Sequence, residues 1–134
     1  MTLDGKIAAQ DGSSRWISSP SSRQIVHQLR GRMDAIIIGR QTALLDDPQL
    51  TARPAGSRIA TRIVMTTNAD LPDHLVLVQT AKDIPTLVVC GPAAPTAKRE
   101  SLAAAGCQLL VCESTCYPEM IGTLLQELGQ RDMT

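Results

Sequence analysis

Between residues 46 and 53 the chain gathers several groups capable of polar chemistry, in the segment D-D-P-Q-L-T-A-R. Asp46 and Asp47 supply two carboxylates, Thr51 a hydroxyl and Arg53 a guanidinium. Pro48 disfavours a continuing helix, so these residues are expected on a loop. Because binding residues are concentrated on loops held by a rigid scaffold, and a buried-strand pattern comes shortly before this segment, we expect a ligand site here.

The element expected to position this loop is a strand followed by a short helix. An uninterrupted apolar run, Ala35 to Ile38, ends at Gly39, and Arg40, Gln41 and Thr42 follow it. A β-branched run without alternation is typical of a strand covered on both faces, as in parallel α/β sheets whose ligands bind beyond the strand ends. Thr42 is expected to cap the helix start, where free N–H groups and the positive dipole end suit a phosphate.

The rest of the chain alternates between helix and strand patterns. Ser19 followed by Pro20 is a helix start signal, and the apolar residues Ile25, Val26, Leu29 and Met33 then form one stripe at helical spacing. This alternation predicts one α/β domain with a largely parallel sheet. The expected strands are Met1–Ala9, Ala35–Ile38, Arg62–Thr66, Thr86–Cys90 and Gln108–Val111, with a further short apolar run at Leu75–Val78; the expected helices run from Pro20 to about Arg32, from Thr96 to Ala105 and from Pro118 to about Gly129.

Length and composition restrict the function classes. The chain has 134 residues, 43% of them apolar, and its 13 basic and 13 acidic residues cancel. This is enough for one globular domain, gives no general electrostatic reason to bind nucleic acid or acidic lipid, and leaves no apolar run long enough to span a bilayer. Because no signal-peptide pattern opens the sequence, a cytoplasmic location is expected.

The four cysteines are expected to be small buried side chains that bind no metal. Cys112 and Cys116 are separated by three residues, but no second ligand pair accompanies them and both histidines are distant in sequence. The phosphate-binding fingerprints G-x-G-x-x-G and G-x-x-x-x-G-K-S/T are also missing from the sequence. Neither a standard dinucleotide-binding fold nor a P-loop therefore has motif support.

Four sequence blocks, in this order and spacing, resemble the reductase domain of bacterial riboflavin biosynthesis. They are L-D-G-K-I-A (Leu3–Ala8), S-R-W-I-S-S (Ser14–Ser19), H-Q-L-R (His27–Arg30) and L-L-D-D-P-Q-L-T-A-R (Leu44–Arg53), and the resemblance covers essentially the whole chain. It implies a dihydrofolate-reductase-like fold, three-layer αβα with a mostly parallel central sheet. It also implies NADPH-dependent reduction of 5-amino-6-(5-phosphoribosylamino)uracil to its ribitylamino product, so the expected partner is a small phosphoribosylamino-pyrimidine.

The resemblance further implies which residues contact the ligands. Guanidinium groups suit a phosphorylated sugar because they donate several hydrogen bonds in a fixed geometry. From composition alone, however, Arg30 and Arg53 could be exposed residues, Trp16 a core residue and Asp46 a solvated carboxylate in a turn. The implied substrate contacts are Lys6, Ser14, Arg30, Leu50 and Arg53, and the implied cofactor contacts are Trp16, Thr42, Asp46 and Thr67.

Arg40 has two interpretations. The riboflavin reductases usually have a small residue here, but the pattern G-R-x-T from Gly39 to Thr42 resembles the cofactor-binding turn of dihydrofolate reductases, in which the arginine reaches the 2′-phosphate of NADPH. We therefore include Arg40 among the expected cofactor contacts; the alternative is a solvated charge. Asp47, which precedes Pro48, is expected to be structural. The proton donor is not assigned, and Lys6, Asp46 or a bound water remain open.

The sequence departs from the family pattern at both ends. It has no V-E-G-G segment, whose glutamate contacts substrate and whose glycines approach the cofactor phosphates, and it lacks the H-x-E and P-C-x-x-C motifs of the zinc deaminase domain often fused upstream. We expect a reductase domain incomplete at its C-terminus that associates as a homodimer through uncovered sheet edges. The rival hypotheses are a non-catalytic remnant, retaining weak nucleotide binding or a subunit-association role, and a dihydrofolate reductase. Against the last, residues 19–32 contain no acidic side chain for a pterin.

Overall fold

The structure, a computed structural model, describes residue 10 and residues 18–133. The predicted strands from residue 35 onwards and the three long predicted helices are all present, with ends within a few residues of those expected. Among the described residues, no helix is both long and apolar enough to cross a membrane. The elements are α1 (Pro20–Arg30), β1 (Ala35–Gly39), α2 (Arg40–Asp46), β2 (Thr61–Met65), α3 (Val76–Gln79), β3 (Thr86–Cys90), α4 (Thr96–Ala104), β4 (Gln108–Val111) and α5 (Tyr117–Gln130).

The four strands form one parallel sheet in the order β1-β2-β3-β4. Ile37 pairs with Ile63, and Val89 pairs with Leu110, so neighbours in the sheet are also neighbours in the chain. A helix lies in each connection between them, as the alternation of patterns predicted. Because the strands run the same way, their carboxyl ends share one edge of the sheet, and loops that follow different strands meet there.

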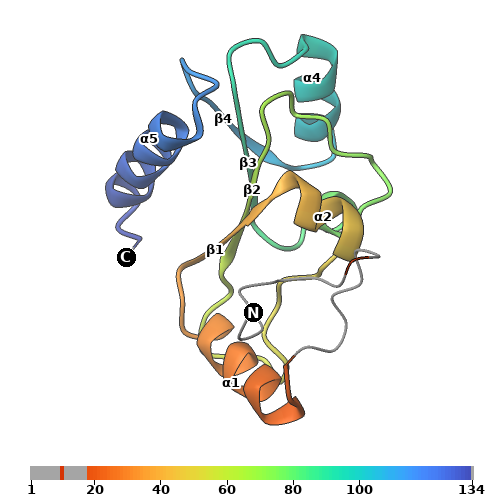
Figure 1. Cartoon of the computed structure of the whole chain (residues 1–134), viewed down its shortest axis with the longest axis vertical. Helices are drawn as coiled ribbons and strands as arrows, with labels where there is room; N and C mark the ends of the chain where they lie inside the picture. The colour runs from red at the N-terminus through yellow and green to blue at the C-terminus, as the bar shows by residue number, and fades with distance from the viewer. Residues whose placement is uncertain (1–9, 11–17, 134) are drawn as a thin grey trace.

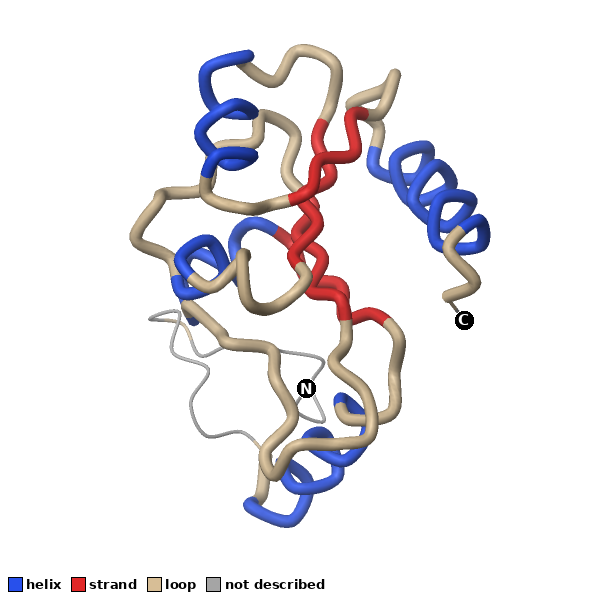
Figure 2. Tube along the Cα trace, turned by 180° about the vertical axis from the view of Figure 1, so that it is seen from behind, coloured by secondary structure: helices blue, strands red, loops and turns tan. Residues whose placement is uncertain are grey.

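Helices cover both faces of the sheet and make the three layers of the αβα arrangement (Figures 1 and 2). On one face, Val64 and Val88 pack with residues of α2, α3 and α4, among them Ala43 and Leu102. On the other face, the apolar side of α5 is inserted against β2 and β3. That second core contains Ile63, Met65, Leu87, Val89, Cys112, Met120, Leu124 and Leu128.

β1 lies at the end of the described sheet, and the expectation that it would be an interior strand covered on both faces is wrong for the described residues. Ile37 is 46% exposed, whereas every residue of β2 and β3 is buried. Ile36 and Ile38 pack against the α2–α4 core, but Ile37 points to the opposite face and belongs to neither core. An uninterrupted apolar run therefore indicated the strand and not its position in the sheet.

Two local predictions also need correction. Leu75–Val78, grouped with the strand-like runs, forms the start of the short helix α3, because an apolar run of four residues carries no periodicity that separates strand from helix. Thr42 does not cap α2. The helix begins at Arg40, Gly39 is its N-cap, and no side chain makes a capping hydrogen bond, so Thr42 is already the third helical residue. The predicted strand Met1–Ala9 lies outside the described residues.

α1 begins as the sequence predicted and is joined to the rest of the domain mainly at its C-terminal end. The Ser19 hydroxyl accepts a hydrogen bond from the Ser22 N–H, and Pro20 occupies the first turn. No residue of α1 is buried among the described residues, and its predicted apolar stripe is largely exposed. At the end of the helix, Gly31 lies so close to Gly56 that neither position has room for a Cβ.

A fully buried arginine, Arg62, lies within β2. Its guanidinium donates to the hydroxyls of Thr86 and Thr80 and to backbone carbonyls of three further residues. Burial lowers the pKa of Arg62, since a charge is less stable away from water. Five neutral oxygens compensate for the lost hydration, and they come from segments that flank the amino ends of β2 and β3.

Candidate functional site

A pocket of about 170 Å³ is lined by residues from the end of α1, from the connector that leads to β2, and by Ile84, which lies two residues before β3. We call it the connector pocket. Apolar groups dominate its lining, which also includes two arginines, Arg30 and Arg58. Ligand pockets usually offer roughly 300–1,000 Å³, so this space is smaller than a typical ligand pocket. It is lined by Arg30, Leu50, Thr51, Ala52, Ala55, Gly56, Arg58, Ile59, Ala60 and Ile84.

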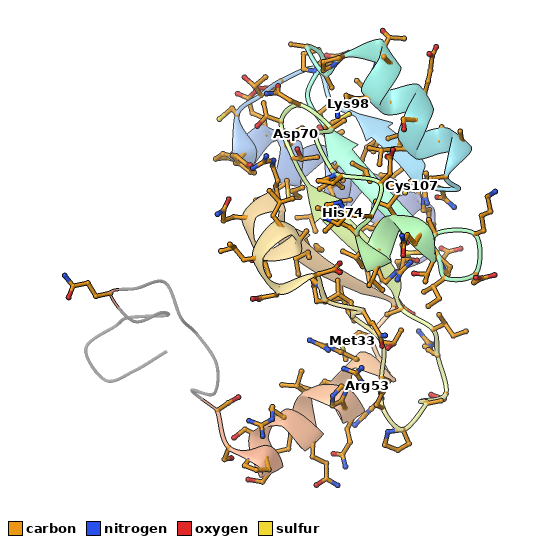
Figure 3. The ribbon with its side chains drawn as sticks, turned by 90° about the vertical axis from the view of Figure 1, so that its right-hand side faces the viewer. Met33, Arg53, Asp70, His74, Lys98 and Cys107 are labelled. Carbon is orange, nitrogen blue, oxygen red and sulfur yellow. The ribbon has the colours of Figure 1, made fainter. Side chains whose placement is uncertain are left out.

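Three of the five predicted substrate residues come together here. Arg30 and Leu50 line the connector pocket, and the charge of Arg53 acts on Arg30. Figure 3 shows Arg53 beside α1. Burial, and secondly the charge of Arg53, lower the pKa of Arg30. Among the described residues neither arginine has an ion-pair partner; Arg53 donates to the Gln49 side-chain oxygen at 2.9 Å. Two cations held close together without a carboxylate favour an anionic group between them.

Leu50 enters this pocket through an unusual backbone conformation. Its φ is 56°, in the left-handed region that a branched side chain rarely adopts, yet its side chain is 4% exposed. Such conformations persist only where the surroundings hold them, and they are concentrated at ligand sites. Asp47 stabilises the same segment from its other end, because its carboxylate accepts the Val76 N–H at 2.8 Å and thereby joins α2 to α3. Asp47 is thus structural, as predicted.

A second, more polar pocket of about 240 Å³ lies at the carboxyl edge of the sheet. We call it the strand-end pocket. Arg40 enters it from the start of α2, the segment after β2 contributes three residues, and Tyr117 comes from the start of α5. Two of the predicted cofactor residues, Arg40 and Thr67, are therefore brought together. The complete lining is Arg40, Thr67, Asn68, Asp70 and Tyr117.

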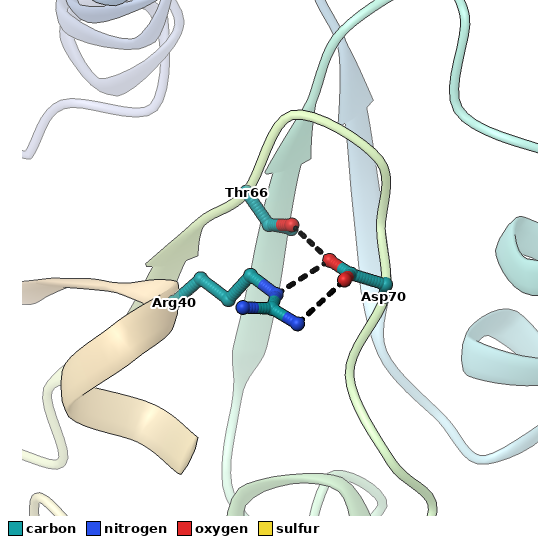
Figure 4. Close-up of polar contacts among 3 residues, drawn as sticks. All are labelled: Arg40, Thr66 and Asp70. Atoms are coloured by element: carbon teal, nitrogen blue, oxygen red, sulfur yellow. Dashed lines mark hydrogen bonds and ion pairs between the residues drawn. The ribbon is translucent and has the colours of Figure 1, made fainter. Parts of the chain in front are cut away.

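Arg40 and Asp70 form a two-point ion pair in the strand-end pocket (Figure 4). Nε of Arg40 donates to one carboxylate oxygen at 2.7 Å, and Nη2 lies 2.6 Å from the other. The Thr66 hydroxyl donates to the same carboxylate at 3.0 Å. Partial burial raises the pKa of Asp70, but the hydrogen bonds from Arg40 and Thr66 and the charge of Arg40 outweigh it and hold the pKa below its usual range. Arg40 is therefore not the solvated charge of the alternative interpretation.

The other predicted cofactor residues on α2 lie outside both pockets. Thr42 and Asp46 are exposed and four residues apart, so they share one face of the helix. In the sequence, Thr42 and Asp46 come between Arg40, which lines the strand-end pocket, and Leu50, which lines the connector pocket. Lys6, Ser14 and Trp16 are outside the described residues.

Several residues of the site were not predicted from the sequence. Asp70 and Tyr117 reach the strand-end pocket because strands distant in sequence end at the same edge of the sheet. The only sequence signal that could have indicated this position for Asp70 is the strand pattern followed by a turn. Thr51, which is not among the expected ligand contacts, lines the connector pocket. Among the described residues no group of three or more His, Cys, Asp or Glu side chains could hold a metal ion. All four cysteines are unpaired, and the expectation that they are buried is confirmed for Cys90, Cys107 and Cys112 but wrong for Cys116, which is exposed.

Comparison with known proteins gives one consistent family. The model of the RibD C-terminal domain matches residues 1–134. Riboflavin biosynthesis protein RibD of Actinobacillus pleuropneumoniae is 37% identical over 130 residues, which are 97% of this chain and 34% of that protein. The chloroplastic riboflavin biosynthesis protein PYRR of Arabidopsis thaliana is 44% identical over 110 residues, 82% of this chain and 18% of that protein.

Solved structures agree with these sequence relatives. RibD of Acinetobacter baumannii superposes with a TM-score of 0.75 at 27% identity, over 97% of this chain and 34% of that one. A diaminohydroxyphosphoribosylaminopyrimidine deaminase/5-amino-6-(5-phosphoribosylamino)uracil reductase of Thermotoga maritima superposes at 0.68 with 26% identity, over 98% and 34%. The chain thus spans about a third of the RibD proteins it matches. It belongs to the RibD C-terminal domain family, the pyrimidine reductase domains of riboflavin biosynthesis, and has their dihydrofolate-reductase-like fold.

Proposed function

We propose that this domain reduces 5-amino-6-(5-phosphoribosylamino)uracil to 5-amino-6-(5-phosphoribitylamino)uracil, with NADPH as the reductant. The name of the Thermotoga maritima relative, which includes 5-amino-6-(5-phosphoribosylamino)uracil reductase, supports the choice of substrate. The observation that carries the proposal is the convergence of Arg30, at the end of α1, with Leu50 and Arg53 of the loop after α2, because only the fold brings this helix and this loop together at the connector pocket.

The connector pocket suits the phosphoribosyl end of this substrate. A phosphate between Arg30 and Arg53 would relieve the repulsion between the two cations and replace the water that burial removes from Arg30. Leu50, Ala60 and Ile84 contribute apolar side chains to the lining of the pocket. A substrate held by its phosphate and by these side chains has its sugar oriented relative to the protein, which is the main contribution a protein makes to such a reaction.

The strand-end pocket fits the charged and hydroxylated part of a dinucleotide. Arg40 keeps its Nη1 group outside the two contacts with Asp70, Thr67 and Asn68 add a hydroxyl and an amide, and the Asp70 carboxylate can accept from a ribose hydroxyl. Thr42 and Asp46 offer further polar groups on the exposed face of α2. When bound, NADPH would supply the hydride; these side chains bind and orient, and none of the described residues is assigned as a proton donor.

The test is the oxidation of NADPH, followed by its absorbance, with the pyrimidine substrate or with dihydrofolate. We expect turnover with the pyrimidine only. Replacing Arg53 by Lys or Arg30 by Lys keeps the charge but removes the planar set of donors. The loss of one charge-assisted interaction, about 1.5–3 kcal/mol, should raise the KM of the pyrimidine roughly 10- to 150-fold.

Arg131→Lys is the matched control. Arg131 lies just beyond α5, contacts Glu127 and Gln108, and lines neither pocket, so KM should stay within twofold of wild type. A folded wild-type chain that binds the pyrimidine or NADPH without turnover would support the non-catalytic rival. Reduction of dihydrofolate in place of the pyrimidine would overturn the proposed substrate.

A further inference from the structure

Arg62 contacts two backbone groups that shape the connector pocket, although its side chain does not line the pocket. Its Nη1 group donates to the carbonyl of Gln49 at 3.5 Å, a long hydrogen bond, and its Nη2 group donates to the carbonyl of Ile84 at 3.1 Å. Gln49 directly precedes Leu50, and Ile84 itself lines the pocket. One buried guanidinium is therefore hydrogen-bonded to two separate segments that contribute lining residues to the pocket.

The contact with Gln49 acts on the strained residue of the site. The carbonyl of Gln49 and the N–H of Leu50 belong to the same rigid peptide group, so holding this carbonyl restricts rotation about φ of Leu50. With φ at 56°, Leu50 is in a conformation that costs of order 1–3 kcal/mol and needs such external support. The Gln49 side chain in turn accepts from Arg53, so the same residue also orients the arginine beside the pocket.

The remaining contacts fix the guanidinium itself. The Thr86 hydroxyl accepts from both Nε and Nη2, at 3.1 and 2.5 Å, the Thr80 hydroxyl accepts from Nη1 at 2.8 Å, and the Leu77 carbonyl accepts from Nη2 at 3.1 Å. All partners offered by the described residues are neutral oxygens. A planar group with donors on three nitrogens can contact all of them at once, whereas a lysine ammonium presents three donors from one point.

We propose that Arg62 is a positioning residue for substrate, which holds the 49–53 loop and Ile84 in the arrangement that receives the phosphoribosyl group. This inference rests on the proposed function of the connector pocket. Nothing about it requires Arg62 to touch the substrate. Its effect passes through Gln49 to Leu50 and Arg53, and through the backbone of Ile84.

The test compares Arg62→Lys with Thr80→Val. The first keeps the charge and removes the geometry. The second leaves the arginine and its hydrogen bonds to the Gln49 and Ile84 carbonyls in place; it removes one acceptor of Nη1 on the α3 side and also a 2.6 Å bond from Thr80 to the Val76 carbonyl. We expect both variants to melt at lower temperature. Only Arg62→Lys should raise the KM of the pyrimidine, at least tenfold, while the KM of NADPH stays within twofold of wild type.

Hydrogen exchange provides a readout that does not depend on activity. In Arg62→Lys the amides of residues 49–53 should exchange at least tenfold faster than in Thr80→Val. Thr86→Val, which removes two contacts of Arg62 and leaves the arginine in place, should change the same quantities in the same direction by about threefold, and it serves if Arg62→Lys does not fold.

Equal pyrimidine KM values and equal loop exchange in the Arg62 and Thr80 variants would overturn the inference, as would a parallel rise in the KM of NADPH. If the wild-type protein does not turn over the pyrimidine, the proposed function fails on its own. The exchange of residues 49–53 then still decides whether Arg62 holds the loop.

Discussion

Gly31→Ala should damage substrate binding far more than it damages stability. Gly31 has φ of −76° and ψ of 0°, a conformation that alanine adopts without strain, so only the space around it matters. A Cβ at this position would lie 2.7 Å from the Gly56 Cα, 3.2 Å from its nitrogen and 3.3 Å from the Ala52 Cβ. Because ordinary contact begins near 3.4 Å, α1 and the connector must separate by at least 3.4 − 2.7 = 0.7 Å.

The two expected effects differ in size for structural reasons. α1 has no buried residue among those described and can move, so the clash should cost less than the roughly 1–3 kcal/mol of overpacking in a core, and the lower entropy of the unfolded alanine chain returns about 0.4–1 kcal/mol. The net change in the free energy of unfolding should therefore stay below about 1 kcal/mol. Arg30, however, moves with α1, and a misplacement approaching 1 Å can lower kcat/KM by up to about 100-fold.

The assay is kcat/KM for the pyrimidine at saturating NADPH, together with urea unfolding. We expect a loss of about 10- to 100-fold in kcat/KM. Gly122→Ala is the control, since a Cβ there meets nothing within 4 Å and alanine within α5 should stabilise the fold by roughly 0.5–1 kcal/mol. A Gly31→Ala enzyme with kcat/KM within twofold of wild type would refute the idea that this close approach sets the pocket.

Three further predictions concern the rest of the domain. Because folding lowers the pKa of Asp70, its ion pair stabilises the fold above the ordinary carboxyl pKa, and this contribution is lost as pH falls through the lowered pKa. The side chains of Arg40 and Asp70 are 37% and 39% exposed, so the contribution is below about 1 kcal/mol. In unfolding measured at decreasing pH, the stability difference between wild type and Asp70→Asn should therefore vanish in acid; a difference that persists would contradict this. Burial raises the pKa of Cys90, Cys107 and Cys112, so iodoacetamide should label exposed Cys116 first, and mass spectra of the native protein with two or more rapid adducts would contradict this. Leu124→Ala should lower the free energy of unfolding in denaturant by about 2–5 kcal/mol, and Leu125→Ala by less than about 0.5 kcal/mol, because Leu124 is fully buried and Leu125 is 58% exposed. Similar losses for the two variants would show that α5 does not pack as described.

The strands and helices were predictable because the chain marks them with strong local signals. β3 is an apolar run that ends just before Gly91-Pro92, and α1 starts at a serine cap followed by proline. The prediction failed where the local signal is weak. The four apolar residues before Gln79 do not distinguish a strand from one helical turn. The N-cap of α2 is Gly39, which has no side chain to form a capping hydrogen bond, so the sequence does not indicate where this helix begins. The position of β1 in the sheet depends on tertiary pairing, which no local pattern encodes.

Only part of the lining of the two pockets was predictable from the sequence. The residues that line the two pockets include Arg30, Leu50, Arg40 and Thr67, all expected from the sequence. Their grouping was not predictable, because it depends on the contact between Gly31 and Gly56 and on the common edge at which the strands end. Arg62 was read as the start of a strand, and nothing in a one-dimensional pattern shows that a cation there is enclosed by five oxygens.

α2 separates the two pockets along the chain, and the proposed function gives this separation a consequence. Arg40 opens the helix at the strand-end pocket, and four residues beyond its end Leu50 enters the connector pocket. Seven helical residues span about 10 Å, and each added residue would move the two ends apart by about 1.5 Å and rotate them by about 100°. Two reacting ligands must bring their atoms to within about 3–3.5 Å of each other. An insertion or deletion in α2 should therefore disturb the reaction more than one in the irregular connector after Pro54.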